Sequence, residues 1–486
     1  MLACVLLMAC SFVASLSSFN ACFAMSLRRV AFCYPPIPSE KGVPLLSQNR
    51  QFQWFSHPTA IYPVVPASAA TLLKSRGYEV GWLDGIVRNL TPDAYWAELV
   101  AWQPDVIFLE TKTPVVHFHL AWAAELKQRL PHCQLVMAGD HVTALPDEIL
   151  KSGHVDAALK GGDYDFALLS WLEGKDYPVD LATLPPIDRN LTRWKDYAYR
   201  NGNFAQTPGA YIMSARDCWH GKCTFCSWTT LYPTYRVRPV AAVLDEIGAL
   251  IELGAKEIMD DAGSLPIGQW LKDFCAGMIA RGYHRKVRID CNMRFGALTA
   301  EDYRMMRRAG FRLVLFGVES ANQATLDRLN KRLTLKQIRD GAKAASAAGL
   351  DVHITLMFGY PWESAADAAR TVALGREFLR TGAAATLQAT WLVPYPGTPL
   401  FKSLDAAGEL LTYDWSRYDM RSPVMRSPLT EDEIRACVSE TYRGFLHPMA
   451  LLRQLLRALK HPAYLLRGAA ALAGHLRDFV QHSSKR

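Results

Sequence analysis

The chain has 486 residues, of which 50% are hydrophobic and 21% are charged. This composition excludes a disordered or fibrous protein, and the length exceeds one ordinary core, so we expect two or three domains. The net charge of +8 is mildly basic. Outside the C-terminal tail no basic stripe with interleaved aromatic residues indicates a nucleic-acid partner.

The first 25 residues form a segment of their own. Residues 1–24 are apolar and uncharged, whereas a secretory signal normally begins with positive residues. Met25 then opens a stretch that reads as a natural start. A mis-called start codon, a targeting peptide and a short membrane anchor all stay open as interpretations.

Residues 26–175 alternate between strand and helix. This alternation is typical of a doubly wound, Rossmann-like parallel sheet, in which ligands bind outside the carboxyl ends of the strands. Those ends carry the sequences YPP, ETKTP, AGDHVT and KGGD. Strands are expected within 29–36, 79–85, 104–114, 133–138 and 155–160, and helices within 67–76, 117–130, 143–150 and 163–174.

A Pro-, Asp- and Asn-rich stretch, 176–207, reads as a linker, and a second alternating region follows over 208–405. Six strand–helix units predict a partial or full (β/α) barrel, whose catalytic groups lie at the carboxyl ends of its strands. The expected strands are 210–216, 256–261, 287–294, 312–320, 351–361 and 385–397.

The alternation stops in the C-terminal region, 406–486, which we expect to be helical and basic. Thr430 and Glu433 form a capping-box start for one helix. Further on, a leucine stripe at helical spacing has basic residues beside it. The stripe indicates either a helix docked on the barrel or a surface-active helix that meets a membrane. The stripe is Leu451, Leu452, Leu455, Leu456 and Leu459, and the basic residues are Arg453, Arg457 and Lys460.

Three cysteines, Cys218, Cys223 and Cys226, lie within nine positions, and the other eight are scattered singly, as free thiols in a reducing compartment would be. Structural zinc usually has four protein ligands, and no second CxxC accompanies this trio, although His220 lies within it. A chance thiol cluster is a further alternative. Three thiolates at the end of a first barrel strand suit a 4Fe–4S cluster better, since the fourth iron stays open.

This constellation resembles the radical S-adenosylmethionine (radical SAM) superfamily, although the spacing here is CxxxxCxxC and the family's usual spacing is CxxxCxxC. The resemblance implies that S-adenosylmethionine chelates the open iron and is cleaved to a 5′-deoxyadenosyl radical. It also implies that Phe225, just before the last cysteine, packs against the adenine.

The resemblance extends to later strands of the barrel. It implies that Asp260 and Asp261 pair with the amino group of S-adenosylmethionine, although the family's frequent Gly-Gly-Glu triplet is absent. It also implies that Arg294 and Glu319 contact S-adenosylmethionine or shape its pocket. The structural alternative is that Arg294 and Glu319 pair with each other inside the barrel mouth.

The region in front resembles the cobalamin-binding domain of one large branch of this superfamily. Where that branch has Gly-Gly-Pro-His-x-Thr, this chain retains Gly139, His141 and Thr143 but has Asp140 in place of proline. The Gly-Glu-Gly-Glu segment of the branch is altered to Gly-Gly-Asp-Tyr at 161–164. The DxHxxG motif that supplies a cobalt-ligating histidine elsewhere is absent, so Gly139, His141 and Thr143 are expected near cobalamin without a motif ligand. A Rossmann-like module without a corrin is the alternative.

The resemblance therefore implies a cobalamin-dependent radical SAM enzyme that functionalises an unactivated carbon, with methyl transfer as the commonest outcome. Cyclisation or rearrangement without methyl transfer is one alternative, and a non-catalytic cobalamin or iron–sulfur sensor is another. The implied partners are a small-molecule or lipid substrate and an electron donor such as flavodoxin or ferredoxin. The cytoplasm is the expected compartment, with membrane contact through the C-terminal helices.

Overall fold

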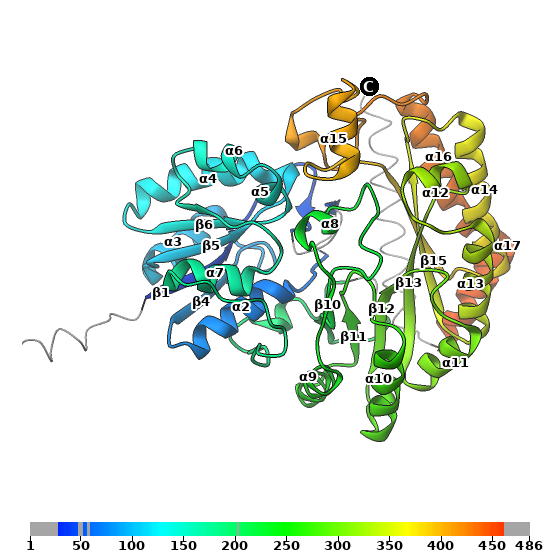
Figure 1. Cartoon of the computed structure of the whole chain (residues 1–486), viewed down its shortest axis with the longest axis horizontal. Helices are drawn as coiled ribbons and strands as arrows, with labels where there is room; N and C mark the ends of the chain where they lie inside the picture. The colour runs from blue at the N-terminus through cyan, green and yellow to red at the C-terminus, as the bar shows by residue number, and fades with distance from the viewer. Residues whose placement is uncertain (1–27, 47–51, 56–58, 202–203, 461–486) are drawn as a thin grey trace, which may run out of the picture.

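The computed structural model describes residues 28–46, 52–55, 59–201 and 204–460. Two parallel sheets with their helices lie side by side, one built from the first third of the chain and one from the middle (Figure 1). The predicted α/β class, a Rossmann-like sheet followed by a partial barrel, is confirmed.

The front sheet has, in the described residues, the strand order β4-β1-β5-β6-β7, and all of its pairings are parallel. Its core strand β5 is buried at every position, as expected for a parallel strand covered on both faces. The strands are β1 (Arg29–Tyr34), β4 (Glu79–Asp84), β5 (Val106–Glu110), β6 (Gln134–Ala138) and β7 (Ala157–Ala158). The order changes direction beside β1, which is where ligands bind in such sheets.

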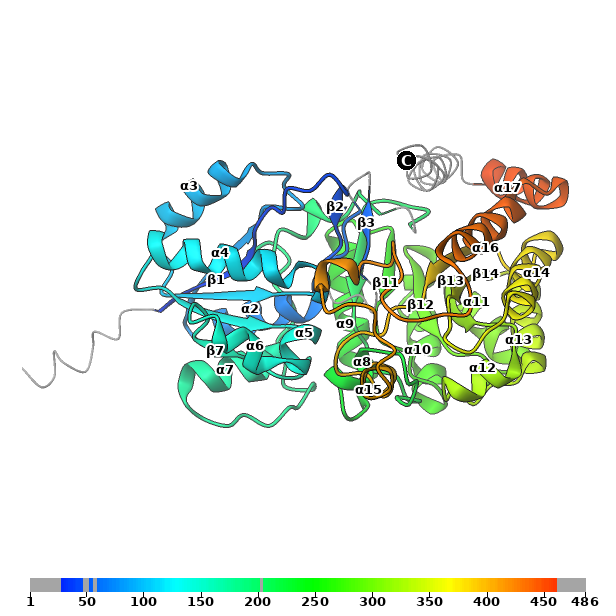
Figure 2. The same cartoon turned by 90° about the horizontal axis from the view of Figure 1, so that it is seen from above.

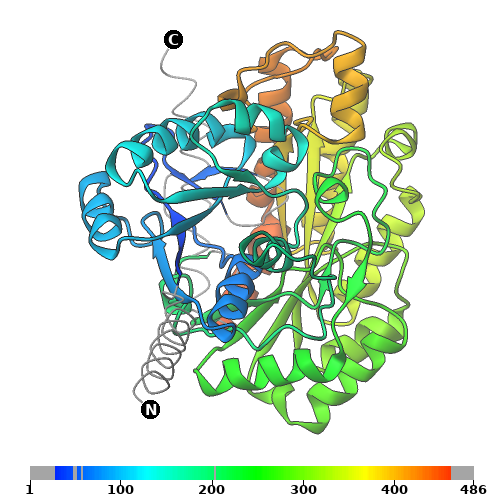
Figure 3. The ribbon, with the colours of Figure 1, turned by 60° about the vertical axis from the view of Figure 1, so that its left-hand side comes forward.

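Helices cover both faces of this front sheet (Figure 3). The helix α3 was not predicted, although Thr91 at its N-cap and Pro92 at its first position are ordinary start signals. A short hairpin of β2 (Val43–Pro44) and β3 (Trp54–Phe55) follows β1. The helices are α2 (Val64–Ser75), α3 (Pro92–Trp102), α4 (Val116–Arg129), α5 (Asp140–Ala144), α6 (Pro146–Lys151) and α7 (Tyr164–Glu173).

The second sheet has the strand order β8-β11-β12-β13-β14-β15, again parallel throughout the described chain. Because the described strands β8 and β15 do not pair with each other, the barrel is partial. The strands are β8 (Gly209–Ile212), β11 (Glu257–Asp260), β12 (Arg288–Met293), β13 (Phe311–Glu319), β14 (Asp351–Phe358) and β15 (Thr386–Trp391).

Amphipathic helices line the outer face of this sheet (Figure 2). Capping boxes begin three of them at Thr299, Thr334 and Ser364. The helices are α9 (Val240–Glu252), α10 (Gln269–Ala280), α11 (Ala300–Arg308), α12 (Gln323–Arg328), α13 (Leu335–Ala347) and α14 (Ala365–Thr381). A short antiparallel pair, β9 (Ala215–Arg216) with β10 (Arg236–Val237), and the one-turn helix α8 (Trp228–Leu231) follow β8.

After β15 the described chain is helical, with α15 (Pro399–Ala406), α16 (Glu431–Arg443) and α17 (Pro448–Lys460). The capping box predicted at Thr430 and Glu433 is confirmed at the start of α16. Val393, Phe401 and Trp415 pack into the same core cluster as front-sheet residues, so the chain after β15 reaches back over both sheets. None of the helices within the described residues is long and apolar enough to cross a membrane. Residues 1–25 lie outside the described part.

Candidate functional site

The three cysteines lie on the loop that leaves the first barrel strand, at its carboxyl end. All three side chains are half-buried and are free thiols. Asp217, directly before Cys218, has a left-handed backbone (φ +73°), which turns the chain out of β9. Strained backbone of this kind clusters at functional sites.

The cysteine loop is held against the segment that follows α12. His220 Nε2 lies 2.7 Å from the Asn330 carbonyl oxygen. In return Asn330 Nδ2 donates to the Lys222 carbonyl at 3.0 Å, and the Thr224 amide donates to the Leu329 carbonyl at 3.1 Å. His220, which lies between Cys218 and Cys223, therefore uses its Nε2 atom to hold the loop.

Two cations stand beside the thiols. Burial raises the pKa of the Cys223 thiol, while Lys331 and Arg294 act in the opposite direction. Burial lowers the pKa of Arg294, and the nearby Cys223 and Cys218 act to raise it. Arg294 donates to the Arg332 carbonyl at 3.1 Å and lies 5.7 Å from the Trp219 ring centre. Thiolates would thus form between fixed positive charges.

Glu319 ends β13 with a left-handed backbone (φ +69°) and pairs with Lys331, not with Arg294. Lys331 Nζ lies 2.8 Å from Glu319 Oε1, and it also donates to the Gly317 carbonyl at 2.8 Å. The Thr355 hydroxyl donates to the other carboxylate oxygen at 3.2 Å. A Cβ on Gly317 would lie 2.1 Å from Glu319 Oε1, so only glycine leaves room for this pair.

Phe225 is half-buried and packs on a small apolar cluster that includes Leu329, Met357 and Tyr360. Lys331 Nζ lies 6.0 Å from the centre of its ring. The ring is therefore placed beside Cys226 and next to the Glu319–Lys331 pair.

Asp260 is the last residue of β11 and Asp261 follows it, but their settings differ. Asp260 is buried, and its Oδ1 accepts the amides of Ser214 and Ala262 at 3.0 and 3.1 Å, so its carboxylate holds the turn. Asp261 is half-buried. Two residues later, a Cβ on Gly263 would lie 2.7 Å from the Asp217 carbonyl carbon and 2.9 Å from the Cys218 nitrogen. The turn after β11 thus touches the backbone of the first cysteine.

The donor chemistry of the trio fits an iron–sulfur cluster, because three half-buried free thiols share one loop and two cations act on the Cys223 thiol. Across the described residues no three Cys, His, Asp or Glu side chains are drawn together as a preformed metal site.

At the carboxyl edge of the front sheet, Thr143 joins the two glycine turns that the sequence singles out. Its hydroxyl donates to the Gly139 carbonyl at 2.7 Å and accepts the Gly161 amide at 3.0 Å. Gly139 has φ +129°, and a Cβ there would lie 2.1 Å from the Thr111 carbonyl. The turn therefore requires glycine.

His141 is fully buried at this edge and faces the C-terminal region. Its Nδ1 lies 3.3 Å from the Thr113 hydroxyl, its Nε2 lies 3.7 Å from Glu148, and its ring centre lies 5.3 Å from that of Trp415. These contacts make it a residue that positions the loop.

Buried polar groups also end β1 and β5. The Tyr34 hydroxyl donates to Glu110 at 3.1 Å, and burial raises the pKa of Glu110 to about 7. The buried Lys112 lies 3.5 Å from Asp140, the residue that replaces the family's proline. Hydroxyl, carboxyl and ammonium groups at this edge suit the amide-rich rim of a corrin, so the donor set fits cobalamin.

The two sheets meet at the cysteine loop. Arg216, two residues before Cys218, pairs with Asp163 at 2.9 Å and Asp165 at 2.6 Å in the front domain. The Gly162 amide donates to the Leu231 carbonyl at 2.9 Å, and Tyr232 packs directly on Gly162. In Figure 1, α8 accordingly lies between the two sheets.

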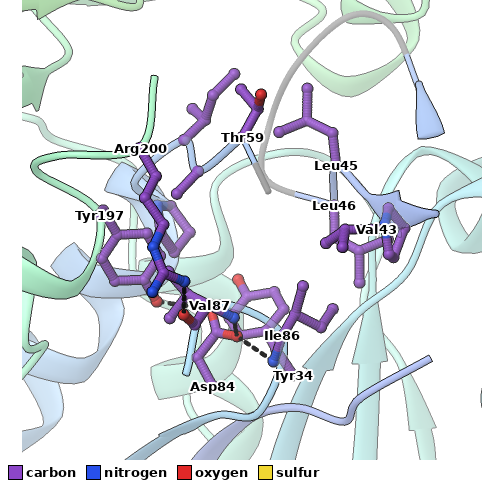
Figure 4. Close-up of a pocket in the computed structure, with 14 residues that line it drawn as sticks. Tyr34, Val43, Leu45, Leu46, Thr59, Asp84, Ile86, Val87, Tyr197 and Arg200 are labelled. Atoms are coloured by element: carbon purple, nitrogen blue, oxygen red, sulfur yellow. Dashed lines mark hydrogen bonds between the residues drawn. The ribbon is translucent and has the colours of Figure 1, made fainter. Parts of the chain in front are cut away.

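A hollow opens at the carboxyl ends of β1 and β4 (Figure 4). Most of its lining is apolar, and its polar members are Tyr34, Thr59, Asp84, Tyr197 and Arg200. Asp84 accepts the amides of Ile86 and Val87, both at 2.9 Å, and the Tyr197 hydroxyl at 2.7 Å. Burial raises the pKa of Asp84 to about 6. The carboxylate thus holds the loop after β4.

Lys331 was missed from the sequence, although it closes the segment that begins with Glu319. Its side chain reaches the site because Asn330 and Arg332 on either side have left-handed backbones (φ +52° and +49°). Hydrophobic periodicity carries no signal for such a turn. Trp219 was missed for the same reason, since it lies on an irregular loop.

Known proteins resemble this chain in sequence and in fold. Residues 212–374 match the radical SAM superfamily. The chain is 25% identical over 418 residues to the anaerobic magnesium-protoporphyrin IX monomethyl ester cyclase of Cereibacter sphaeroides, covering 78% of this chain and 66% of that protein. It is also 25% identical to an uncharacterized methyltransferase of Pyrococcus horikoshii (86% and 94% covered) and to the hopanoid C-3 methylase of Methylococcus capsulatus (74% and 72%).

Solved structures share the whole two-domain fold. The radical S-adenosylmethionine methyltransferase TsrM from Kitasatospora setae superposes with a TM-score of 0.62 at 17% identity, covering 87% of this chain and 85% of its own. The cobalamin-dependent radical enzyme OxsB gives 0.63 at 13% identity, covering 94% and 76%. Residues 212–374 are therefore a radical SAM domain, and the chain as a whole has the fold of the cobalamin-dependent radical SAM enzymes.

Proposed function

We propose that this protein is a cobalamin-dependent radical SAM enzyme that methylates an unactivated carbon. The observation that carries the proposal is the cysteine loop. Three half-buried thiols share one loop within a radical SAM domain, Lys331 and Arg294 act on the Cys223 thiol, and ion pairs tie this loop to a Rossmann-like domain. A non-catalytic cobalamin or iron–sulfur sensor would need no pocket for S-adenosylmethionine, which Asp260, Asp261, Arg294 and Glu319 would form around the loop.

The residues of the barrel divide the work. Cys218, Cys223 and Cys226 would ligate a 4Fe–4S cluster, and Phe225 would pack against the adenine of S-adenosylmethionine. When bound, the cluster supplies the electron that cleaves S-adenosylmethionine, and cobalamin supplies the methyl group.

Around the cluster loop, Arg294 and Glu319 would contact S-adenosylmethionine, with Lys331 keeping the Glu319 carboxylate in place. Asp261 would pair with the ammonium group of S-adenosylmethionine. Asp260 would hold the turn that presents Asp261. It accepts hydrogen bonds from the Ala262 amide in that turn and from the Ser214 amide just after β8.

The front domain would hold cobalamin at its carboxyl edge. Gly139 and Thr143 would shape the cradle through their mutual hydrogen bond, and His141 would keep the edge rigid from inside. Since His141 is buried against Trp415, cobalamin would bind without a ligand from this histidine.

Methyl transfer is favoured over cyclisation because two of the similar proteins are a methylase and a methyltransferase and TsrM shares the fold. The cyclase relatives keep ring formation as the second candidate. The hopanoid methylase supports a lipid or isoprenoid substrate, reached by peripheral contact with a membrane. A flavodoxin- or ferredoxin-type protein would supply electrons.

The test is anaerobic reconstitution of the full chain with iron, sulfide and cobalamin, followed by reduction and addition of methyl-labelled S-adenosylmethionine. We expect 5′-deoxyadenosine from the native protein and from Cys437→Ala, whose half-buried thiol lies outside the trio. Cys223→Ala should yield none. Identical output from native protein and Cys223→Ala would refute the enzyme. Radical cleavage with a cyclised, unlabelled product would favour the cyclase.

A further inference from the structure

The last described helix, α17, docks with its polar side inward. Ala450 is buried, and Gln454 Nε2 donates to the Ala385 carbonyl at 2.7 Å. The Arg453 guanidinium lies over Gly382, where a Cβ would be 3.0 Å from its Nε. These contacts fix α17 against the end of α14, so a docked helix is found, but the leucine stripe is not the docked face.

The leucines of α17 point outward instead. Leu451, Leu452, Leu455 and Leu456, here called the leucine face, are 48–58% exposed. Leu446 and Met449 beside them are exposed as well. These six make up nearly half of the large exposed hydrophobic residues of the described chain, all within eleven positions. Figure 2 places α17 at the outer edge of the molecule. A globular protein normally buries such a stripe, and an exposed apolar face of this size is suited to binding a partner.

The charge around the leucine face indicates what that partner is. Between residues 441 and 477 the sequence holds six basic residues and no acidic one. Basic amphipathic helices with a leucine-rich face lie in the interface of anionic bilayers. A second copy of this chain would bring like charges together, which disfavours a dimer through this face.

We propose that the leucine face of α17 inserts into the headgroup region of an anionic lipid bilayer, to which the net positive charge of the flanking sequence attracts it. The enzyme would thus lie on a membrane surface without a spanning helix. This inference deepens the proposed function by naming the contact surface, but it does not depend on the catalytic reaction.

The test is co-sedimentation of the full, anaerobically purified chain with vesicles of phosphatidylcholine, with and without 30% phosphatidylglycerol. We expect binding to the anionic vesicles only, weakened several-fold in high salt. The triple variant Leu452→Gln/Leu455→Gln/Leu456→Gln should lose at least tenfold in partitioning. The matched control, Leu150→Gln/Leu411→Gln, removes leucines that are 44% and 49% exposed elsewhere and should bind like the native chain.

Three further readouts make the outcome decisive. The triple variant should keep the circular dichroism spectrum and the 5′-deoxyadenosine production of the native chain, which would show that only the surface has changed. Loss of membrane binding can then be distinguished from loss of activity. A native chain that ignores anionic vesicles would overturn the proposal. So would a concentration-dependent dimer, measured by light scattering, that the triple variant abolishes. Equal vesicle binding by native chain and triple variant would overturn it as well.

Discussion

Two positive side chains and one carboxylate set the chemistry of the cysteine loop. Lys331 is shared between Glu319 and the Cys223 environment, so it acts on the thiol and on the carboxylate at once. Its position over Phe225 adds a third contact. Because the thiolate is the form that binds iron, the cation favours cluster assembly at neutral pH.

Replacing Lys331 by Met should raise the pKa of the Cys223 thiol further, since a neighbouring cation is lost. The measurement is the pH profile of Cys223 alkylation in cluster-free protein, followed by peptide mass spectrometry. Lys331→Arg should keep the native profile, and Cys437 in the same sample serves as the internal reference. A Lys331→Met profile that coincides with the native one would contradict this role.

Glu110 predicts a pH dependence of stability. Burial raises its pKa from the usual 4.5 to about 7 in the native state. The native protein therefore keeps this proton up to pH 7, whereas the unfolded chain releases it near 4.5. The stability contributed by this group is present below pH 4.5 and is lost as the pH rises to 7.

Glu110→Gln, which mimics the protonated side chain, should therefore stabilise the protein at pH 8, by up to about 3 kcal/mol, and change little at pH 4.5. Thermal unfolding midpoints at the two pH values measure this. Glu252→Gln, at the exposed end of α9, provides the control. Equal effects of Glu110→Gln at both pH values would show that Glu110 is ionised in the native protein.

At the scale of elements, close backbone approaches hold the loops where the site needs them. Gly162 in the turn before α7 meets the ring of Tyr232 after α8, and Gly263 after β11 meets the backbone of Cys218. In each case a side chain would push apart two loops that come from different strands.

Gly162→Ala should therefore destabilise the contact between the front domain and α8, because the new Cβ would lie 2.3 Å from Tyr232 Cζ. Overpacking of this kind costs about 1–3 kcal/mol. The double variant Gly162→Ala/Tyr232→Leu, which removes the colliding ring atoms, should recover most of the lost unfolding temperature. No recovery would mean that the strain arises elsewhere.

Strands and the helices between them could be predicted from the sequence because parallel strands are short apolar runs and the helices are amphipathic. The strands β5, β12 and β14 lie where these runs do. The turns could not be predicted, since Asp217, Glu319 and Asn330 adopt left-handed backbones without being glycine. The pairing of Glu319 with Lys331 depends on those turns, so the alternative of an Arg294–Glu319 pair was wrong.

The direction of α17 could not be predicted either. The leucine spacing specifies a helix and one apolar face, but not whether that face meets protein or solvent. Contacts of Arg453 and Gln454 with the end of α14 decide it.

On the scale of the whole molecule, buried ion pairs lock the two domains together beside the cysteine loop. Asp165 is fully buried and pairs with Arg216, which lies two residues before Cys218. Arg216 also pairs with Asp163, so removing Asp165 takes away one of its two partners. Complete loss of the partners of a buried charge costs about 3–5 kcal/mol, which sets the upper bound here.

Asp165→Asn should loosen the domain contact and lower the unfolding temperature markedly. It should also speed cleavage by protease between the two sheets, in the residues that connect them. Glu79→Gln, which breaks the exposed pair with Arg29, should leave both properties near the native values. Native-like protease resistance of Asp165→Asn would show that the Asp165–Arg216 pair does not hold the domains together.

The central claim is that Cys218, Cys223 and Cys226 hold a 4Fe–4S cluster whose open iron binds S-adenosylmethionine. The most direct test is electron paramagnetic resonance of the reduced, reconstituted protein before and after S-adenosylmethionine is added. We predict a 4Fe–4S signal whose g-values shift when S-adenosylmethionine is added, and no such signal in Cys223→Ala. A signal that S-adenosylmethionine leaves unchanged, or a trio that takes up zinc and no iron, would contradict it.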